Sequence, residues 1–452
     1  MSGRRFGSLS RRGFLAAAGA VGGAAVAGCS QRTSGPNEVR MWGVGGDSRD
    51  AEQKVIDTFQ QKNPTIKVTS QNVPSSGNSG DATSVITAVR GKTAPDLWWM
   101  DRFAGAQYAA LGLLEPIDDL IEKYEEPGFL DAWLPFTVNE LSYQGKMYGL
   151  PTVTDTRGLY YNKTLLRQAG VDPDELDMSN GPITVERLFE IGDKITKTDK
   201  IGNFTRMGFV PWQGQGSGYT WSMGLHAQYF DPKTCELTMT SDPIIDAYQL
   251  SYDFARKNDY SRIDAFIKSY EPDNAPPGQT AFNGGKLGMV IETSGTAHTI
   301  SKYAPKLDWG YTHLPVFKAG DDPYTWSGGF SLVMPKGSSR SEAAWEFMKH
   351  YAGVPGQTIY CPPTSSLPTQ EAVFDIPALK SVRTQLSQLS YSTSRPPIPV
   401  GALWWDAVSQ VMSTVKIGSA TPRAALERAQ DRVDGQMQTY CPFTLPKGYS
   451  ET

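Results

Sequence analysis

The feature that most constrains the fold of this chain is a regular alternation of short strand-like and helical segments after residue 37. Residues 38–42 read as a strand, and apolar side chains recur at helical spacing over residues 49–62. A second strand at 65–70, a helix near 82–91 and a third strand that ends near residue 99 follow. This order predicts an open α/β sheet with helices on its faces.

The chain has 452 residues, more than a single hydrophobic core usually organises, so two domains are expected. Its content of 39% hydrophobic and 20% charged residues is typical of globular proteins. The same alternation continues to the end of the chain. The later predicted elements are strands at 159–161 and 287–291 and helices at 163–169, 184–198, 242–257, 338–351, 402–416 and 421–438.

The first 28 residues form a predicted export signal. Arg11-Arg12 precedes an apolar stretch over residues 13–28, which is the order of a twin-arginine signal. This stretch is shorter than the roughly 20 residues that a membrane-spanning helix needs. Residues 26–29, Val-Ala-Gly-Cys, resemble a lipobox, so Cys29 is predicted to carry a lipid. The polar residues 29–37 are then a tether between the lipid and the folded domains.

The charge balance excludes one class of partner. The chain carries 43 Lys and Arg against 47 Asp and Glu, a formal net charge of −4. Four of the arginines lie in residues 1–28, which contain no acidic residue, so the remainder is more acidic than the whole. An acidic body is a poor nonspecific ligand for nucleic acid, and we expect no nucleic-acid partner.

Motifs for cofactors, metals and catalysis are lacking. The glycine-rich turn at residues 43–46 does not have the spacing of a dinucleotide-binding loop. The four His are isolated and no Cys-x-x-Cys pair exists, so no metal site is expected. Neither a nucleophile elbow nor a His-Glu-x-x-His motif occurs. We therefore predict a protein that is not an enzyme. An exported glycosidase remains the alternative, because its two carboxylates need not be neighbours in sequence.

The tryptophans point toward a carbohydrate ligand. Several of the 11 Trp stand beside Gly, Pro or polar turn residues, close to Asp47, Asp101 and Asp155. An aromatic plane covers the apolar face of a sugar ring, and polar side chains bind its hydroxyl groups. Core packing remains the alternative for any single tryptophan.

Four segments in order resemble the family-1 extracellular solute-binding proteins, the carbohydrate-capturing subunits of ABC importers, which are similar to maltose-binding protein. The resemblance runs over nearly the whole mature chain. The segments are residues 95–105 (PDLWWMDRFAG), 143–151 with 159–163 (YQGKMYGLP and LYYNK), 281–289 (AFNGGKLGM) and 395–399 with 404–408 (RPPIP and WWDAV).

The resemblance implies roles for individual residues. Asp47 matches the carboxylate on the first glycine-rich turn, Asp101 and Arg102 match the polar pair after the third strand, and Asp155 matches an acidic residue before the first crossover. The two aromatic positions that stack on sugar in the second domain match Tyr219 and Trp405. The full set of predicted ligand-binding residues is Trp42, Asp47, Trp99, Asp101, Arg102, Asp155, Trp212, Tyr219, Trp221, Trp326, Gly328, Gly329, Arg395 and Trp405.

One departure from the family pattern bears on the ligand. The family usually has Gly-x-Trp after the strand that ends in Met289, whereas this chain has Ser-Gly-Thr-Ala at residues 294–297. The missing stacking surface argues against maltose itself, and Trp212, Trp221 and Trp326 are the candidates to replace it.

The resemblance also implies the architecture, a type II periplasmic-binding-protein fold of two α/β lobes joined by three hinge crossovers. The first lobe is expected over residues 38–156 plus 328–375, and the second over 157–327 plus 376–452. The crossovers are expected near residues 155–160, 326–331 and 367–385, with Gly328-Gly329 supplying mobile backbone.

Besides Cys29, the chain has Cys235, Cys361 and Cys441, which permit one disulfide and one free thiol in an exported protein. Their spacing does not identify the pair. A bond between Cys361 and a cysteine of the second lobe would tie the hinge, which argues against that pairing.

The predicted function is that of a monomeric solute-binding subunit, lipid-anchored to the outer face of the cell membrane. It is expected to close around a neutral sugar and to present it to the permease subunits of an ABC importer. A glycerophosphodiester or phosphorylated polyol is the alternative ligand, with Arg102 or Arg395 at the phosphate. A surface adhesin, which would have no closing cleft, is a further alternative.

Overall fold

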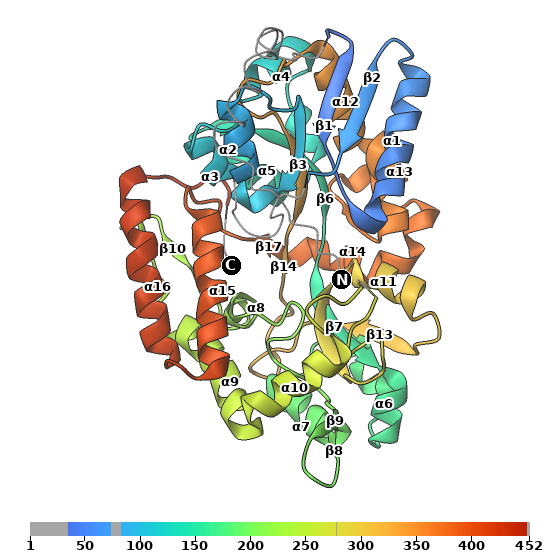
Figure 1. Ribbon diagram of the computed structural model, residues 1–452, viewed down its shortest axis with the longest axis vertical. Helices are drawn as coiled ribbons and strands as arrows, with labels where there is room; N and C mark the ends of the chain where they lie inside the picture. The colour runs from blue at the N-terminus through green and yellow to red at the C-terminus, as the bar shows by residue number, and fades with distance from the viewer. Residues whose placement is uncertain (1–34, 74–82, 277, 450–452) are drawn as a thin grey trace, which may run out of the picture. The chain divides into compact units, whose positions relative to one another are not determined.

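The computed structural model describes residues 35–73, 83–276 and 278–449. The predicted signal, Cys29 and most of the predicted tether lie outside the described residues. Six strands form the larger sheet (Figure 1). They lie in the order β16 (Leu367–Pro368), β6 (Gly149–Thr154), β15 (Gly329–Val333), β3 (Leu97–Asp101), β1 (Glu38–Trp42) and β2 (Lys67–Gln71).

The three strands that come first in the chain, β1, β2 and β3, are parallel, as the predicted strand-helix alternation requires. β1 pairs in parallel with β2 and β3, and β15 enters antiparallel between β3 and β6. Side chains alternate along β1, where Val39 and Met41 are buried and Glu38 is exposed. α12 (Glu342–Ala352) packs against β1, β6 and β15, and α1 (Arg49–Lys62) and α13 (Val354–Thr364) pack beside it. We call this part of the chain the first lobe.

The smaller sheet has three antiparallel strands, β12 (Met289–Thr293), β7 (Arg157–Asn162) and β13 (Trp309–Thr312). Both of its faces are covered. Leu159 and Tyr161 join one hydrophobic cluster with side chains of α7 (Val185–Ile195), and Tyr160 joins a second cluster with side chains of α10 (Tyr260–Tyr270). The near-continuous apolar run of β7 is explained by burial on both sides. We call this part the second lobe.

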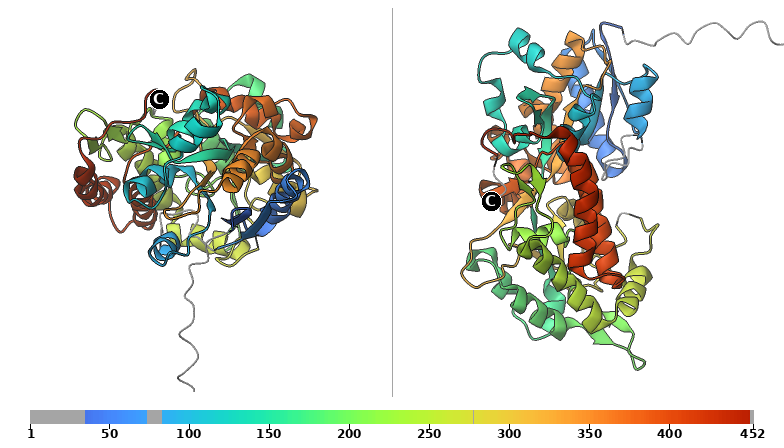
Figure 2. Two further views of the ribbon diagram at one scale, coloured as in Figure 1. Left: turned by 90° about the horizontal axis from the view of Figure 1, so that it is seen from above. Right: turned by 90° about the vertical axis from the view of Figure 1, so that its left-hand side faces the viewer.

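Two long C-terminal helices, α15 (Gly401–Ile417) and α16 (Pro422–Met437), pack against each other and against α9 (Asp242–Asn258) of the second lobe (Figures 1 and 2). α15 also contacts α8 (Gly218–Met223) and α3 (Gly105–Ala110). The C-terminal helices therefore lie against the second lobe and reach the first.

The chain passes between the two lobes three times. β6 continues into β7 through Asp155-Thr156, and β14 (Thr325–Ser327) continues into β15 through Gly328. The third passage runs from β16 to β17 (Ser392–Ser394), which pairs in parallel with β14. The crossovers predicted near residues 155–160 and 326–331 coincide with the first two passages. The strands of the two sheets also fall within the predicted lobe ranges, whose exact boundaries remain a prediction.

A disulfide joins Cys235 to Cys441, and Cys361 is a buried free thiol. The sequence left the pairing open, and the structure shows that Cys361 forms no bond across the hinge. Cys235 and Cys441 both lie in the predicted second lobe, so the bond closes within that lobe.

Some predicted elements differ from the structure. The helix expected at 338–351 begins only at Glu342, because Ser341 rather than Ser338 or Ser339 caps it through the amide of Ala344. α10, α11 (Thr296–Tyr303) and α13 were not predicted. α13 contains Pro362 and Pro363 in its last turn, and prolines ordinarily indicate the end of a helix. Five further short helices among the described residues are α2 (Thr83–Arg90), α4 (Asp118–Tyr124), α5 (Pro135–Asn139), α6 (Lys163–Gln168) and α14 (Arg383–Ser387).

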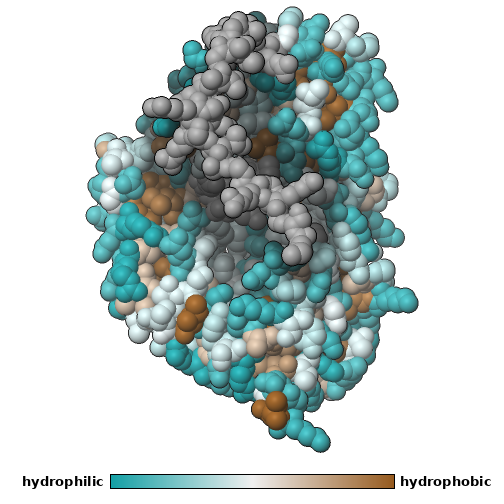
Figure 3. Space-filling model, viewed as in Figure 1, coloured by the Kyte–Doolittle hydropathy of each residue, from teal (hydrophilic) through white to brown (hydrophobic). Residues whose placement is uncertain are grey.

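Among the described residues, no helix combines the length and apolar character that would let it cross a membrane. On the face drawn in Figure 3, hydrophobic side chains are scattered among hydrophilic ones. The large exposed hydrophobic side chains stand singly in the sequence, such as Ile201 on the loop between β8 (Lys197–Thr198) and β9 (Phe204–Arg206).

Candidate functional site

Four of the five polar side chains predicted for the site, those of Asp101, Arg102, Asp155 and Arg395, gather around Gly328, where the second crossover passes between the lobes. The amide of Gly328 donates to Asp155 Oδ1 at 2.6 Å. Its carbonyl accepts from Arg102 Nη2 at 2.7 Å and from Thr154 Oγ1 at 2.9 Å. This one glycine therefore joins side chains from the third strand and from the first crossover.

Arg102 has a structural role, and the prediction that it faces a ligand is wrong for this arrangement. Its side chain is fully buried and pairs with Glu140 at 2.9 Å, and Nη1 donates to the carbonyl of Val153 at 2.5 Å. Burial raises the pKa of Glu140, and the adjacent Arg102 charge opposes that rise. Arg102 thus holds the ends of β3 and β6 to the crossover.

Gly329 is required by this packing. Its φ of +135° is unfavourable for residues with a side chain, and a Cβ there would lie 2.2 Å from the carbonyl oxygen of Val153 and 2.4 Å from Arg102 Nη1. Gly329 therefore packs closely against Arg102 and against the backbone of β6.

Asp101 and Arg395 form a second ion pair, at 3.0 Å, that is largely buried. The side chain of Asp101 is 18% exposed and that of Arg395 is 4% exposed. Asp101 also accepts from the amide of Phe103 at 3.3 Å. The guanidinium of Arg395 lies 3.9 Å from the ring centroid of Phe103 and 4.9 Å from that of Trp405. A partly exposed carboxylate is thereby fixed beside an aromatic ring.

Asp155 and Arg157 form a third pair on the first crossover, with the Asp155 side chain 21% exposed. Arg157 lies over Trp326, with its guanidinium carbon 3.4 Å from the ring centroid. Burial lowers the pKa of Arg157, and the Asp155 charge works in the opposite direction. A Cβ placed on Gly328 would come within 3.1 Å of Arg157 and 3.2 Å of Arg395, so the second and third pairs flank the same glycine.

The aromatic residues predicted for the second lobe cluster around the same crossover, but most are buried. The ring of Tyr219 contacts Trp326 at 5.1 Å, Trp404 at 5.6 Å and Trp405 at 5.7 Å. Tyr219 and Trp326 are each 1% exposed, so neither presents a face to a solute in this arrangement. Trp405 is only partly buried, and it is the member of the cluster that retains accessible ring surface.

The remaining predicted tryptophans lie elsewhere. Trp221 is fully buried, with its indole N–H donated to Pro211 at 2.8 Å, so its predicted contact with ligand is wrong for this arrangement. Trp212 is partly buried against Phe254 in the second lobe. Trp42 and Trp99 are partly buried in the first lobe, where Trp99 stacks on Phe330 at 3.7 Å.

Asp47 lies on the exposed turn after β1, as predicted, but its carboxylate is bound by the second lobe. Lys302 Nζ lies 2.7 Å from Oδ1, and the hydroxyl of Tyr303 donates to Oδ2 at 2.6 Å. Hydrogen bonds from Lys302 and Tyr303 lower the pKa of Asp47. Asp47 therefore bridges the lobes in this arrangement and becomes available to a solute only when that bridge opens.

A small polar pocket of about 170 Å³ in the second lobe was missed by sequence reasoning. It is lined by Gln213, Glu271 and Glu292 together with Asn283 and Thr296. Burial raises the pKa of Glu292 to about 7, and the charge of Glu271 adds to the rise. Glu292 stands near the carboxyl end of β12, a position comparable to that of Asp101 on β3, and this position was the available signal.

The described part of the chain contains no group of three or more His, Cys, Asp or Glu side chains placed to hold a metal ion. At the crossovers, the structure brings together ion pairs and aromatic rings, groups that can bind polar molecules.

Three comparisons place this geometry among known proteins. Residues 45–358 match the family model described as bacterial extracellular solute-binding protein. The chain is 25% identical over 337 residues to the arabinooligosaccharide-binding protein of Bacillus subtilis, covering 73% of each chain. It is 22% identical over 431 residues to the maltotriose-binding protein of Pyrococcus abyssi, covering 89% of this chain and 81% of that one.

A third relative is named for a phosphorylated ligand. The sn-glycerol-3-phosphate-binding periplasmic protein of Agrobacterium fabrum is 24% identical over 308 residues, covering 65% of each chain. Among solved structures, the mannobiose-bound CpMnBP1 superposes with a TM-score of 0.77 at 22% identity, covering 88% of this chain and 99% of that one. This likeness confirms the predicted two-lobed fold.

Proposed function

The chain belongs to the bacterial extracellular solute-binding proteins, and from this premise we propose that it captures a neutral oligosaccharide between its lobes for an ABC importer. Two of the relatives are named for neutral oligosaccharides, and the structure with the same fold holds mannobiose. The proposed ligand is thus a short neutral sugar chain that contacts both lobes.

The observation that carries this proposal is the pairing of the arginines at the crossovers. Arg102, Arg157 and Arg395 each lie against a carboxylate, those of Glu140, Asp155 and Asp101 respectively. A phosphorylated solute needs cationic or N–H donors that remain uncompensated. Because these three positive charges are already balanced, the crossover region favours a neutral solute over a glycerophosphodiester.

Polar hydrogen-bonding capacity is nevertheless present there. The Nε atoms of Arg157 and Arg395 are buried and have no hydrogen-bond partner among the described residues. The carboxylates of Asp101 and Asp155 are partly exposed. Donors and acceptors of this kind match the hydroxyl groups of a sugar, and the partly exposed ring of Trp405 matches its apolar face.

The proposed capture works by closure of the lobes. Shifting a two-state equilibrium from 1:99 to 99:1 requires about 5.5 kcal/mol of differential binding. A micromolar dissociation constant corresponds to about 8 kcal/mol, which is sufficient. Asp47 exchanges its bond to the second lobe for a bond to solvent or solute when the lobes separate.

The proposed location is the outer face of the cell membrane. The lipobox-like residues 26–29 support a lipid on Cys29, and residues 30–37 supply a polar tether. The anchored monomer would present its solute to the permease subunits.

The test is a thermal-shift screen of the protein against neutral di- and oligosaccharides and against glycerophosphodiesters, followed by titration of each hit. We expect stabilisation by a neutral oligosaccharide and no release of product on prolonged incubation. Trp405→Ala should weaken binding at least tenfold, because it removes the accessible ring.

Trp221→Phe is the matched control. Trp221 is an equally large indole that is fully buried, so its replacement should lower thermal stability and leave affinity unchanged. Stabilisation by glycerophosphodiesters alone, or steady cleavage of an oligosaccharide, would contradict the proposal.

A further inference from the structure

The segment after the last long helix, residues 441–447, is held to the second lobe by a covalent bond; we call it the C-terminal strap. Its first residue, Cys441, is bonded to Cys235 in the turn between β10 (Phe230–Asp231) and β11 (Glu236–Leu237). This hairpin is itself tied to α16, because the amide of Leu237 donates to Asp434 Oδ1 at 2.9 Å. The strap therefore begins from a fixed point on the second lobe.

Phe443 of the strap contacts one residue from each of the two predicted lobe ranges. Its ring centroid lies 5.9 Å from that of Phe230, which falls within the range predicted for the second lobe. It lies 6.1 Å from that of Tyr143, with the two planes inclined by only 19°. Phe443 is 5% exposed, so nearly all of its surface is covered by these and neighbouring contacts.

Tyr143 belongs to the first lobe. It lies in β4 (Ser142–Tyr143), which pairs with β5 (Lys146–Met147) just before the chain enters β6 of the larger sheet. The amide of Met147 in β5 donates to the carboxylate of Asp118 at 3.1 Å, which ties this hairpin to α4. The ring of Phe443 thus packs on a hairpin that is bonded into the first lobe.

The end of the described chain reaches the hinge. The hydroxyl of Tyr449 donates to the carbonyl of Ser394 at 3.0 Å, and Ser394 lies in β17, the strand of the third crossover. The C-terminal residues therefore touch the second lobe, the first lobe and a crossover in succession.

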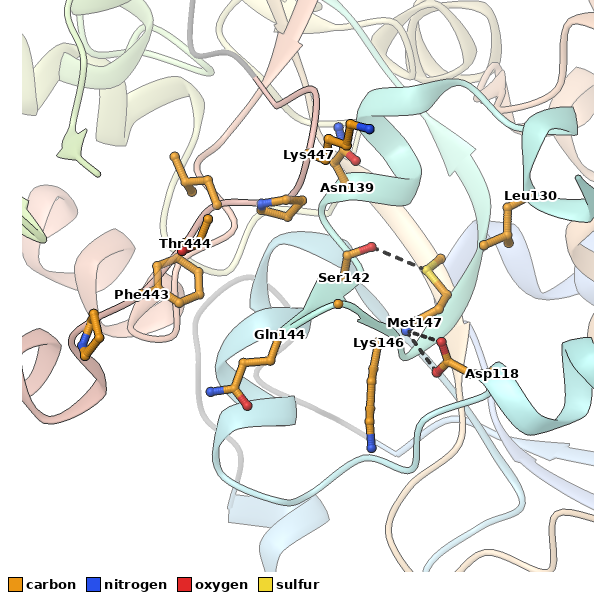
Figure 4. A pocket seen from close by; sticks show the side chains of 14 residues that line it. Asp118, Leu130, Asn139, Ser142, Gln144, Lys146, Met147, Phe443, Thr444 and Lys447 are labelled. Atoms are coloured by element: carbon orange, nitrogen blue, oxygen red, sulfur yellow. Dashed lines mark hydrogen bonds between the residues drawn. The ribbon is translucent and has the colours of Figure 1, made fainter. Parts of the chain in front are cut away.

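Between the strap and the β4–β5 hairpin lies a groove of about 620 Å³ (Figure 4). Its polar lining comes from both sides, and includes Asn139, Ser142, Gln144, Lys146, Thr444 and Lys447. Figure 4 shows Phe443 and Thr444 on one side of this space and Ser142, Gln144 and Lys146 on the other. Across this groove, the stacked rings of Phe443 and Tyr143 join the strap to the hairpin.

We propose that the C-terminal strap sets the resting arrangement of the two lobes, with the disulfide as its anchor and Phe443 as its fastening to the first lobe. Relative movement of the lobes changes the separation of Tyr143 and Phe230, so it must break at least one of the two ring contacts. Aromatic contacts of this kind and the associated burial favour the packed arrangement by about tenfold or more. The strap acts in the absence of any solute, so the proposal does not depend on the identity of the ligand.

The test measures the distance between the lobes without ligand. Spin labels are attached through noncanonical amino acids at Lys54 on α1 of the first lobe and at Ile201 of the second, both exposed, and the distance distribution is recorded by pulsed electron paramagnetic resonance. Phe443→Ala should move the population toward a second distance by about tenfold in the ratio of the two arrangements.

Two further variants define the mechanism. Phe189→Ala removes a ring that packs on Phe209 and Phe254 within the second lobe, so it should leave the distance distribution unchanged. The double variant Cys235→Ser/Cys441→Ser frees the anchor and should shift the distribution in the same direction as Phe443→Ala.

An unchanged distribution in Phe443→Ala would overturn the proposal, and so would a shift caused by loss of the disulfide but not by loss of the ring. If circular dichroism shows that Phe443→Ala does not fold, Phe443→Leu replaces it. Leucine keeps apolar volume without the ring, so a smaller shift in the same direction is expected, and no shift would again overturn the proposal.

Discussion

The ion pair of Asp101 and Arg395 offers the sharpest test of how the crossover region is built. Asp101→Ala removes the partner of a guanidinium that is 4% exposed and also removes the acceptor for the amide of Phe103. Stranding a buried charge costs roughly 3–5 kcal/mol, and losing a helix cap costs about 1 kcal/mol. Because Asp101 is 18% exposed and water can reach the vacated space, we expect a loss near the lower end, about 3–4 kcal/mol.

The measurement is urea unfolding followed by circular dichroism. The double variant Asp101→Ala/Arg395→Met removes both charges, so it should lose less stability than Asp101→Ala alone. The matched control is Asp375→Ala, which breaks an exposed pair with Arg383 and should cost less than about 1 kcal/mol. A loss below about 1 kcal/mol for Asp101→Ala would refute the reasoning, as would a double variant less stable than the single one.

Asp101→Ala should lower both the stability of the protein and its affinity for sugar, so these two effects must be measured separately. A folded domain has only about 5–15 kcal/mol of stability, so affinity has to be measured well below the lowered unfolding temperature. There we expect at least a tenfold weakening of sugar binding. Asp101→Asn, which keeps the shape and the cap, should weaken binding with a smaller loss of stability.

The other predictions concern single groups. The folded pKa of Glu292, about 7, exceeds the ordinary 4.5, so the folded chain retains a proton and the free energy of unfolding falls as the pH rises through that interval. Glu292→Gln should remove this pH dependence. Melting temperatures of both proteins at pH 5 and pH 8 will show it. Lys302→Ala should broaden the interlobe distance distribution without changing the melting temperature, because its bond to Asp47 is exposed; a distribution identical to the wild type would refute the bridge. Cys235→Ser/Cys441→Ser should lower the free energy of unfolding by about 2–4 kcal/mol, measured with urea, and an unchanged midpoint would contradict this. Cys361 should resist alkylation in the folded protein and react on unfolding, because burial raises the pKa of its thiol; rapid native labelling followed by peptide mass spectrometry would show otherwise.

Periodicity predicted much of the fold because local sequence determines it. The spacing of Val55, Ile56 and Phe59 gives α1, and the turn at residues 43–46 exposes Asp47 as expected. The first two crossovers were expected from the family resemblance, because periodicity alone does not show where the chain leaves one sheet for another.

The roles of the charged residues could not be predicted in the same way. Arg102 follows a strand, where arginines are ordinarily exposed, but its burial depends on Glu140, 38 positions later in the chain. Tyr303 meets Asp47 across 256 positions and two lobes, and the neighbouring Lys302 meets the same carboxylate. No local pattern specifies the register of such contacts.

The tryptophans show the same limit. Trp221 and Trp405 both stand next to turn or polar residues, and yet only Trp405 keeps accessible surface. Which indole is covered depends on how α8 and α15 pack together, and that packing involves residues almost 200 positions apart.

Calorimetric titration of the protein with a panel of neutral oligosaccharides tests the central claim most directly. One sugar should bind saturably with a stoichiometry of one, with a dissociation constant at or below the micromolar range and no heat of continuing turnover. Absence of binding to every neutral sugar, together with tight binding of a glycerophosphodiester, would contradict the account.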